Sequence, residues 1–183
     1  DNKPKLLYLI PTFQNPQGFT ITLARRKEIL KITNKYAIPI LEDDCYADNR
    51  YQGDSVTSFF NLDSEDSVIY VGSFSKIIGP GMALGYMTAP STVLDKIMGV
   101  KRGRISDFTA MAVERYANKF LDTHIVEINH IQKMRRDAMI SALGENFGTS
   151  AKWSNPDGGL YIWVEFPEGT DVQALVSKSL DQI

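Results

Sequence analysis

Short apolar runs alternate with an amphipathic stretch along the first half of the chain. Runs without polar interruptions are typical of strands covered on both faces. Four such runs predict strands, at 6–10, 37–41, 67–72 and 85–89. Between the first two, Thr22 is a suitable N-cap for a helix to about Tyr36, with Ile29, Ile32 and Tyr36 on its apolar face. The order strand, helix, strand predicts a βαβ unit, and therefore an α/β fold with a mainly parallel sheet and flanking helices.

The second half of the chain has mainly helical periodicity. Helices are predicted over 92–100 and 109–121. A separate long helix follows, in which apolar residues recur at spacings of three or four residues from Ile125 to Ala138. No internal repeat or low-complexity segment interrupts this order.

The pattern changes again near residue 148. Residues 160–166 alternate as a strand exposed on one face, and a helix is predicted over 171–180. We therefore expect a domain boundary here, with 1–148 as one domain and 149–183 as the beginning of a small, incomplete α+β domain.

Composition excludes several classes of protein. The chain has 183 residues, 43% hydrophobic and 23% charged, which is enough for a folded core and too apolar for a disordered protein. A net charge of −2 gives no bulk electrostatic reason to bind nucleic acid or a membrane surface, and no apolar run reaches the roughly 18 residues of a membrane helix. A single cysteine, Cys45, excludes an internal disulfide, and with only two histidines we expect no metal site. The expected location is the cytoplasm.

Both ends of the sequence have the character of an interrupted chain. The first predicted strand has nothing before it to pair with, and the last residues fall inside a predicted helix. No methionine begins the sequence. We expect a fragment of a longer protein; the alternative is a small complete domain.

Four clusters with chemical potential follow strands or turns. They are Asn15–Gly18, Glu42–Tyr46, Ser73–Lys76 and Gly158–Gly159. In open parallel sheets, ligands bind outside the carboxyl ends of the strands. Asp43 and the segment 73–76 could therefore face one crevice.

Each cluster alone has an ordinary explanation. Asn-Pro-x-Gly is a common turn, an acidic pair is usually solvated or a cap, and Ser-x-Ser-Lys also suits a helix cap with a surface lysine. Together they suit one chemistry. A lysine amine forms a Schiff base with an aldehyde cofactor, an acid keeps a pyridine nitrogen protonated, and hydroxyl and N–H groups hold a phosphate.

The chain resembles fold-type I pyridoxal 5'-phosphate (PLP) enzymes of the class I/II aminotransferase superfamily. The branch is that of 2-aminoadipate and kynurenine aminotransferases and of the aminotransferase-like domains of MocR-type regulators. The signatures are PTFQNPQG at 11–18, EDDCYADNRY at 42–51, VGSFSKIIGPGMALGY at 71–86 and PDGGLYIWVEF at 156–166. The resemblance covers essentially the whole chain, and implies the second half of a PLP-binding large domain followed by the start of the C-terminal small domain.

The resemblance also implies roles for single residues. Lys76 would carry the cofactor as a Schiff base and later move the proton between substrate and cofactor. Asp43 would pair with the pyridine nitrogen and make the ring an electron sink. Asp44 has no implied role.

Four more residues would hold the cofactor. The resemblance implies that Tyr46 and Asn15 bind its phenolic oxygen, that Asn15 also reaches the substrate carboxylate, and that Ser73 and Ser75 hold the phosphate. Cys45 would only pack.

One position departs from the family pattern. The family has an arginine that pairs with the phosphate where this chain has Ala83. A lost charge-assisted hydrogen bond of roughly 1.5–3 kcal/mol should loosen the cofactor. Lys101, Arg102 and Arg104 are candidate replacements; the alternative is that they form a solvated or interface cluster.

Three functions stay open at this point. The first is a PLP-dependent aminotransferase, a cytoplasmic, biosynthetic homodimer that acts on an amino acid and a 2-oxo acid. The second is the PLP-binding sensor domain of a MocR-type regulator, whose DNA-binding domain would lie upstream. The third is a degenerate relative that binds PLP weakly.

Overall fold

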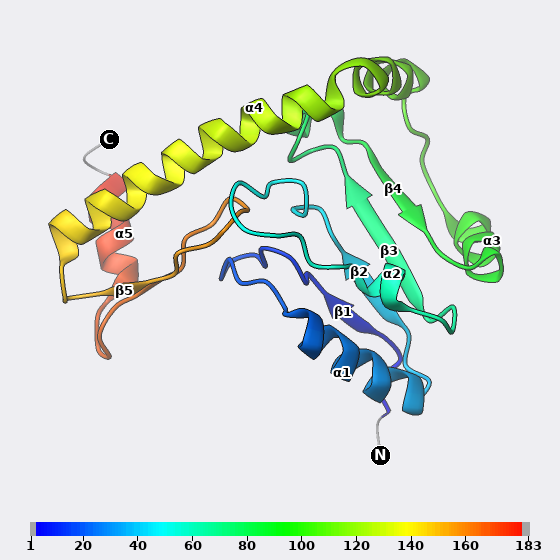
Figure 1. Cartoon of the computed structure of the whole chain (residues 1–183), viewed down its shortest axis with the longest axis horizontal. Helices are drawn as coiled ribbons and strands as arrows, with labels where there is room; N and C mark the ends of the chain where they lie inside the picture. Colours follow the sequence, from blue (N-terminus) through cyan, green and yellow to red (C-terminus); the bar gives the residue numbers. More distant parts are fainter. Residues whose placement is uncertain (1–2, 181–183) are drawn as a thin grey trace.

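A four-stranded sheet is the centre of the structure (Figure 1). The computed structural model describes residues 3–180. The strands are β1 (Leu7–Leu9), β2 (Ile40–Asp43), β3 (Val68–Ser73) and β4 (Gly85–Thr88), side by side in that order. The first three run parallel, with Tyr8 opposite Leu41 and Asp43 opposite Val71, whereas β4 is antiparallel to β3. The predicted α/β class and mainly parallel sheet are confirmed.

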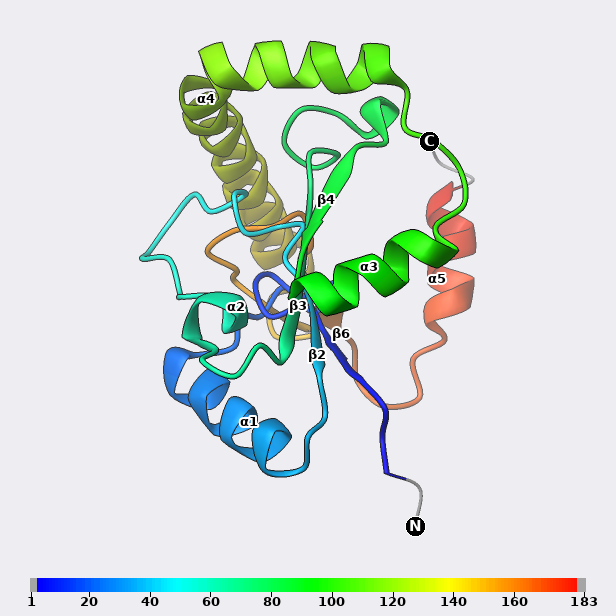
Figure 2. The same ribbon diagram turned by 90° about the vertical axis from the view of Figure 1, so that its right-hand side faces the viewer.

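Two helices cover one face of this sheet (Figure 2). They are α1 (Leu23–Lys35) and the short α2 (Phe59–Leu62). Thr22 is the N-cap of α1 as predicted, since its hydroxyl oxygen accepts the N–H of Arg25 at 3.3 Å. Burial is concentrated beneath the two helices. The core there consists of Leu30, Ile40, Phe59 and Val68.

The predicted apolar face of α1 is correct only in part, because Ile29 packs against the core whereas Ile32 and Tyr36 do not. Arg26, Leu30 and Thr33 are buried, whereas Ile32 and Tyr36 are each 52% exposed. The physical reason is the side chain of Arg26, which lies under the sheet edge and fixes the rotation of the helix about its axis.

The opposite face of the sheet is open within residues 3–180. Leu41, Ile69 and Val71 are only half-buried there, and three of the four residues of β4 are exposed. The prediction that helices cover both faces is therefore met on one face only. A continuously apolar strand shows that both faces are apolar, but it does not specify the segment that covers each face.

A single long helix replaces two predicted ones. After α3 (Ser91–Val100), α4 runs from Asp107 to Phe147, 41 residues, and changes direction along its length (Figures 1 and 2). No proline occurs in this stretch and the first glycine is Gly144, so nothing ends the helix near 122–124. The gap in the apolar pattern marks a change of buried face.

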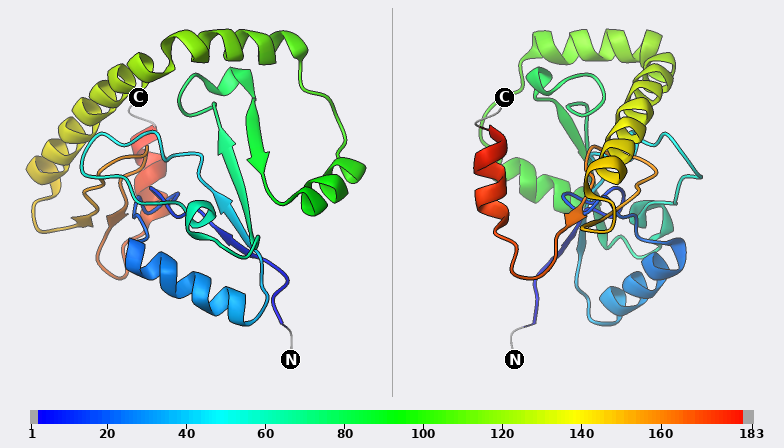
Figure 3. Two further views of the ribbon diagram at one scale, coloured as in Figure 1. Left: turned by 45° about the vertical axis from the view of Figure 1, so that its right-hand side comes forward. Right: turned by 90° about the vertical axis from the view of Figure 1, so that its left-hand side faces the viewer.

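The chain then forms a small second sheet (Figure 3). Beyond α4, β5 (Lys152–Trp153) pairs antiparallel with β6 (Val164–Glu165), and α5 (Val172–Leu180) follows. The predicted strand at 160–166 is thus reduced to two residues. Its first part is held elsewhere, because the preceding Gly158 bridges to Arg50 and the Gly159 N–H donates to the Asn49 carbonyl.

None of the helices within residues 3–180 is both long and apolar enough to cross a membrane.

Candidate active site

Two acids, Glu42 and Asp43, end β2 and a third, Asp44, follows it; the alternation of the chain directs them to different sides. Glu42 points toward α1 and α2, whereas Asp43 lies on the open face. There the hydroxyl of Tyr8 donates to Asp43 Oδ2 at 2.6 Å. This bond, followed by burial, raises the pKa of Tyr8 to about 12. Asp43 is therefore accessible and already bonded at one oxygen.

Glu42 is a structural acid. Its carboxylate accepts the N–H groups of Phe59 (2.8 Å) and Phe60 (2.9 Å) at the start of α2, and lies 3.8 Å from Arg26 Nη1. Burial raises the pKa of Glu42, while the two N–H bonds and Arg26 oppose that rise. The sequence analysis missed Arg26, although an arginine in line with Leu30 and Thr33 at helical spacing was a usable signal.

Arg26 ties four segments together. Its guanidinium donates to the backbone carbonyls of Pro11, Ile21 and Thr57 and to the hydroxyl of Thr12, at 2.9–3.1 Å. Arg26 and Glu42 are both fully buried. The pair thereby fixes the end of β2 and the turn that leads to Asn15.

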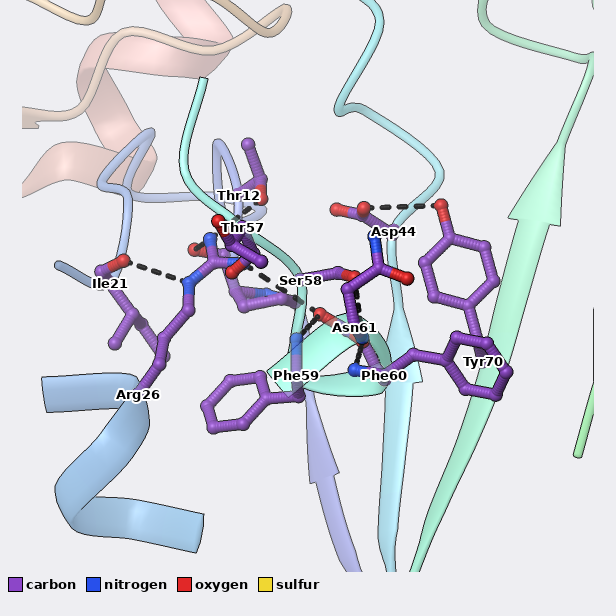
Figure 4. Close-up of polar contacts among 12 residues, drawn as sticks. Thr12, Ile21, Arg26, Asp44, Thr57, Ser58, Phe59, Phe60, Asn61 and Tyr70 are labelled. Atoms are coloured by element: carbon purple, nitrogen blue, oxygen red, sulfur yellow. Dashed lines mark hydrogen bonds and ion pairs between the residues drawn. The ribbon is translucent and has the colours of Figure 1, made fainter. Parts of the chain in front are cut away.

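Asp44 lies close to Tyr70 (Figure 4) and lines a polar cavity together with it. It accepts the hydroxyl of Tyr70 at 3.2 Å, and its other oxygen has no partner among the described residues. Burial raises the pKa of Asp44. It does not join Asp43 on the open face.

Asn15 and Tyr46 come together, and Tyr161 joins them. Asn15 Nδ2 lies 3.4 Å from the Tyr46 hydroxyl and 3.3 Å from the Tyr161 hydroxyl, and the two hydroxyls are 3.4 Å apart. The rings of Tyr46 and Tyr161 meet edge to face. Burial, then the bond to Tyr161, raises the pKa of Tyr46. Tyr161 was missed as an individual site residue; its signal was a phenol two residues beyond Gly159.

Gly158 and Gly159 are required by close packing on Phe13. A Cβ atom on Gly158 would overlap the Phe13 ring, and one on Gly159 would lie 2.6 Å from Phe13 Cβ. Phe13 is 1% exposed, and the Arg50 guanidinium covers its ring at 4.5 Å. This packing sets Asn15 and Tyr161, each two residues away, beside each other.

The segment 73–76 directly follows β3. Ser75 N–H donates to Ser73 Oγ at 3.1 Å, and the Lys76 carbonyl accepts the side-chain amide of the buried Asn49 at 3.1 Å. One residue further, the Ile77 carbonyl lies 2.9 Å from His124 Nε2 on α4. Because a carbonyl only accepts, that nitrogen carries the proton. The backbone around Lys76 is therefore fixed from two sides.

Asp43 and Lys76 share a neighbour, Cys45. Burial is the main reason that the pKa of its thiol is raised to about 12, and the Asp43 carboxylate adds to the effect. The Lys76 ammonium acts in the opposite direction on the same thiol. No ion pair joins the Lys76 amine to the Asp43 carboxylate within the described residues.

The comparisons with known proteins decide the family. The sequence model for aminotransferase class I and II matches residues 1–182. The chain belongs to this family. It is 37% identical to aromatic-amino-acid aminotransferase 1 of Thermococcus litoralis, over 97% of the chain and 44% of the relative. It is 31% identical to the HTH-type transcriptional regulator NorG of Staphylococcus aureus, over 98% of the chain and 41% of the relative.

A solved structure gives the same result. The crystal structure of the kynurenine aminotransferase of Pyrococcus horikoshii, in complex with pyridoxamine phosphate and kynurenine, superposes with a TM-score of 0.91 at 37% identity. The match covers 97% of this chain and 45% of that one. The fold is therefore that of fold-type I PLP enzymes, and the chain spans about half the length of the relatives that it matches.

The donor set fits the cofactor of this PLP-dependent family. The carboxyl ends of β2 and β3 bring an amine, an accessible carboxylate and hydroxyls to one edge of the sheet, with the amide and phenols of the Asn15 cluster beyond them. Among residues 3–180, no group of three or more metal-ligating side chains gathers.

The family's phosphate-binding arginine has no counterpart at Ala83. This residue is exposed, caps the 3₁₀ turn Pro80–Met82 and has a left-handed backbone with φ 45°. Lys101, Arg102 and Arg104 are exposed between α3 and α4, and their side chains make no hydrogen bond or ion pair within the described part of the chain. Their assignment to the phosphate stays a prediction.

Proposed function

We propose that the full-length protein is a PLP-dependent aminotransferase that moves an amino group between an amino acid and a 2-oxo acid. The observation that carries this proposal is the parallel pairing of β2 with β3, with Asp43 opposite Val71, which brings Asp43 and the segment that contains Lys76 to the same edge of the sheet. Ligands of open parallel sheets bind at that edge.

Each polar group has a distinct task in this proposal. PLP, when bound, supplies an aldehyde and an electron-withdrawing ring. Lys76 holds the cofactor through its amine and moves the proton at the substrate Cα. Asp43 accepts the N–H of the pyridine ring and keeps that nitrogen protonated.

The remaining residues orient and bind. Tyr46 and Asn15 direct hydrogen bonds to the phenolic oxygen of the cofactor, and Asn15 also reaches the substrate carboxylate. Ser73 and Ser75, with neighbouring N–H groups, bind the phosphate.

The test is a transamination assay of the full-length protein with Lys76→Ala. We expect loss of turnover with all amino donors, because no other amine stands at this place. Lys27→Ala, which removes an exposed lysine of α1, is the matched control and should leave turnover unchanged. Normal turnover in Lys76→Ala would refute the proposal.

A sensor domain of a MocR-type regulator is the second candidate, and the similarity to NorG favours it. The two candidates differ in the sequence upstream. An upstream winged-helix domain, together with PLP-dependent binding to its own promoter DNA and no turnover, would establish the regulator.

Further properties belong to the same proposal. We infer a cytoplasmic, biosynthetic homodimer in which 1–148 is the second half of the large domain and 149–183 begins the small domain. Sedimentation of the full-length protein as a fully active monomer would contradict the dimer.

A further inference from the structure

The strongest unassigned contact on the open face joins Tyr8 to Asp43. Tyr8 is the middle residue of β1, and the parallel register sets it opposite Leu41, two residues before Asp43. Its neighbours Leu7 and Leu9 pack into the core under the helices. Strand alternation therefore directs the phenol of Tyr8 to the face on which Asp43 lies.

The chemistry of the contact fixes its direction. An ionised carboxylate only accepts hydrogen bonds, so Tyr8 is the donor over the 2.6 Å to Asp43 Oδ2. Bonds of this kind are short and stronger than neutral ones. The bond to Asp43 is the main reason that the pKa of Tyr8 is raised to about 12.

The bond leaves the other oxygen of Asp43 for a partner. Asp43 is the last residue of β2, and apart from the neighbouring Cys45 thiol, Tyr8 is the only side-chain donor to its carboxylate among the described residues. With Oδ2 held by Tyr8, the rotation of the Asp43 carboxylate is restricted.

We propose that Tyr8 is a positioning residue, which orients the Asp43 carboxylate toward the ring nitrogen of the cofactor. The inference rests on the proposed function, because it presumes that PLP binds at this edge. Tyr8 does not touch the reacting atoms; it restricts Asp43 to the orientation in which the carboxylate meets the pyridine N–H.

The chain offers a matched control. Tyr36 is 52% exposed, as is Tyr8, but lies at the end of α1, and its hydroxyl makes no hydrogen bond among the described residues. Tyr8→Phe and Tyr36→Phe thus remove the same atom from equally exposed rings, and only the first removal acts on Asp43.

The experiment measures the affinity of the full-length apo-protein for two probes. One is PLP, and the other is its carbocyclic analogue in which C–H replaces the ring nitrogen. We expect Tyr8→Phe to weaken PLP about three- to tenfold and to leave the analogue unchanged, because the analogue has no N–H for Asp43. Tyr36→Phe should change neither affinity, and Tyr8→Phe should add nothing in an Asp43→Ala background.

Two results would overturn the inference while the proposed function stands. One is an unchanged PLP affinity in Tyr8→Phe, and the other is an equal loss for both probes, which would indicate a purely structural effect. Failure of the unsubstituted protein to bind PLP would overturn both proposals.

Discussion

The two faces of the sheet give carboxylate side chains opposite environments. On the helix face, Glu42 is enclosed with Arg26 and bonded by two N–H groups at the start of α2. On the open face, its neighbour Asp43 meets one phenol and is accessible. Adjacent acids therefore have different environments, because the pleat sends them to different sides of the sheet.

The difference also explains where the two faces are sensitive. The helix face is closed, so a lost partner leaves a buried charge without compensation. The open face is partly solvated, so a lost partner changes binding more than folding. Substitutions on the two faces should therefore affect folding on the helix face and binding on the open face.

Arg26→Ala should lower the free energy of unfolding of the full-length protein by about 3–5 kcal/mol, since it leaves Glu42 buried and unpaired. Urea unfolding followed by circular dichroism measures the change. The control is Arg25→Ala, whose arginine forms an exposed pair with Glu28 at 3.0 Å; such pairs contribute at most about 1 kcal/mol. Equal losses of unfolding free energy in the two variants would show that the buried pair is no more important to folding than the exposed one.

Gly158→Ala should cost about 1–3 kcal/mol, because the added methyl group overlaps the Phe13 ring and forces repacking. The same unfolding experiment applies. Gly99→Ala is the control, since a Cβ atom there meets open space inside a helix. We expect the control to be stabilised by about 0.5–1 kcal/mol, and a neutral Gly158→Ala would show that the loop adapts.

Much of this arrangement could be predicted from the sequence. The apolar runs place the four strands to within a few residues, and Thr22 marks the start of α1. The motif residues Asn15 and Tyr46 do meet. Local patterns succeed here because each depends on neighbouring residues alone.

The rest depended on contacts between distant segments. Arg26 is buried because carbonyls from three other segments receive it, and that contact rotates α1 away from the face that Ile32 and Tyr36 suggest. Tyr161 reaches Asn15 across 146 positions of sequence. Periodicity along one element contains no information about such partners.

Ala83→Arg should tighten PLP binding by up to roughly tenfold, if about 1.4 kcal/mol is recovered from the phosphate. A PLP titration of the full-length apo-protein measures it. Ala37→Arg is a close control, because Ala37 is also exposed and also left-handed, with φ 47°, but lies beyond the end of α1. Unchanged affinity in Ala83→Arg would mean that another cation already serves, with Lys101, Arg102 and Arg104 the first to substitute.

Asp44→Asn should remove part of the pH dependence of the free energy of unfolding in the acidic range. The raised pKa of Asp44 means that the folded state holds this proton more tightly than the unfolded state. Stability therefore falls as pH rises from the ordinary carboxyl pKa through the raised one, and the asparagine variant should lack that fall. Thermal unfolding across pH measures it, with the exposed Asp54→Asn as control. A variant profile parallel to that of the unsubstituted protein would show that Asp44 does not contribute.

The central claim is that Lys76 is the amine that holds the cofactor. The direct measurement is borohydride reduction of the full-length protein with PLP, followed by peptide mass spectrometry. The account predicts a phosphopyridoxyl group on Lys76 and none above background on the other lysines. A stable modification on a different lysine, or none on Lys76, would contradict it.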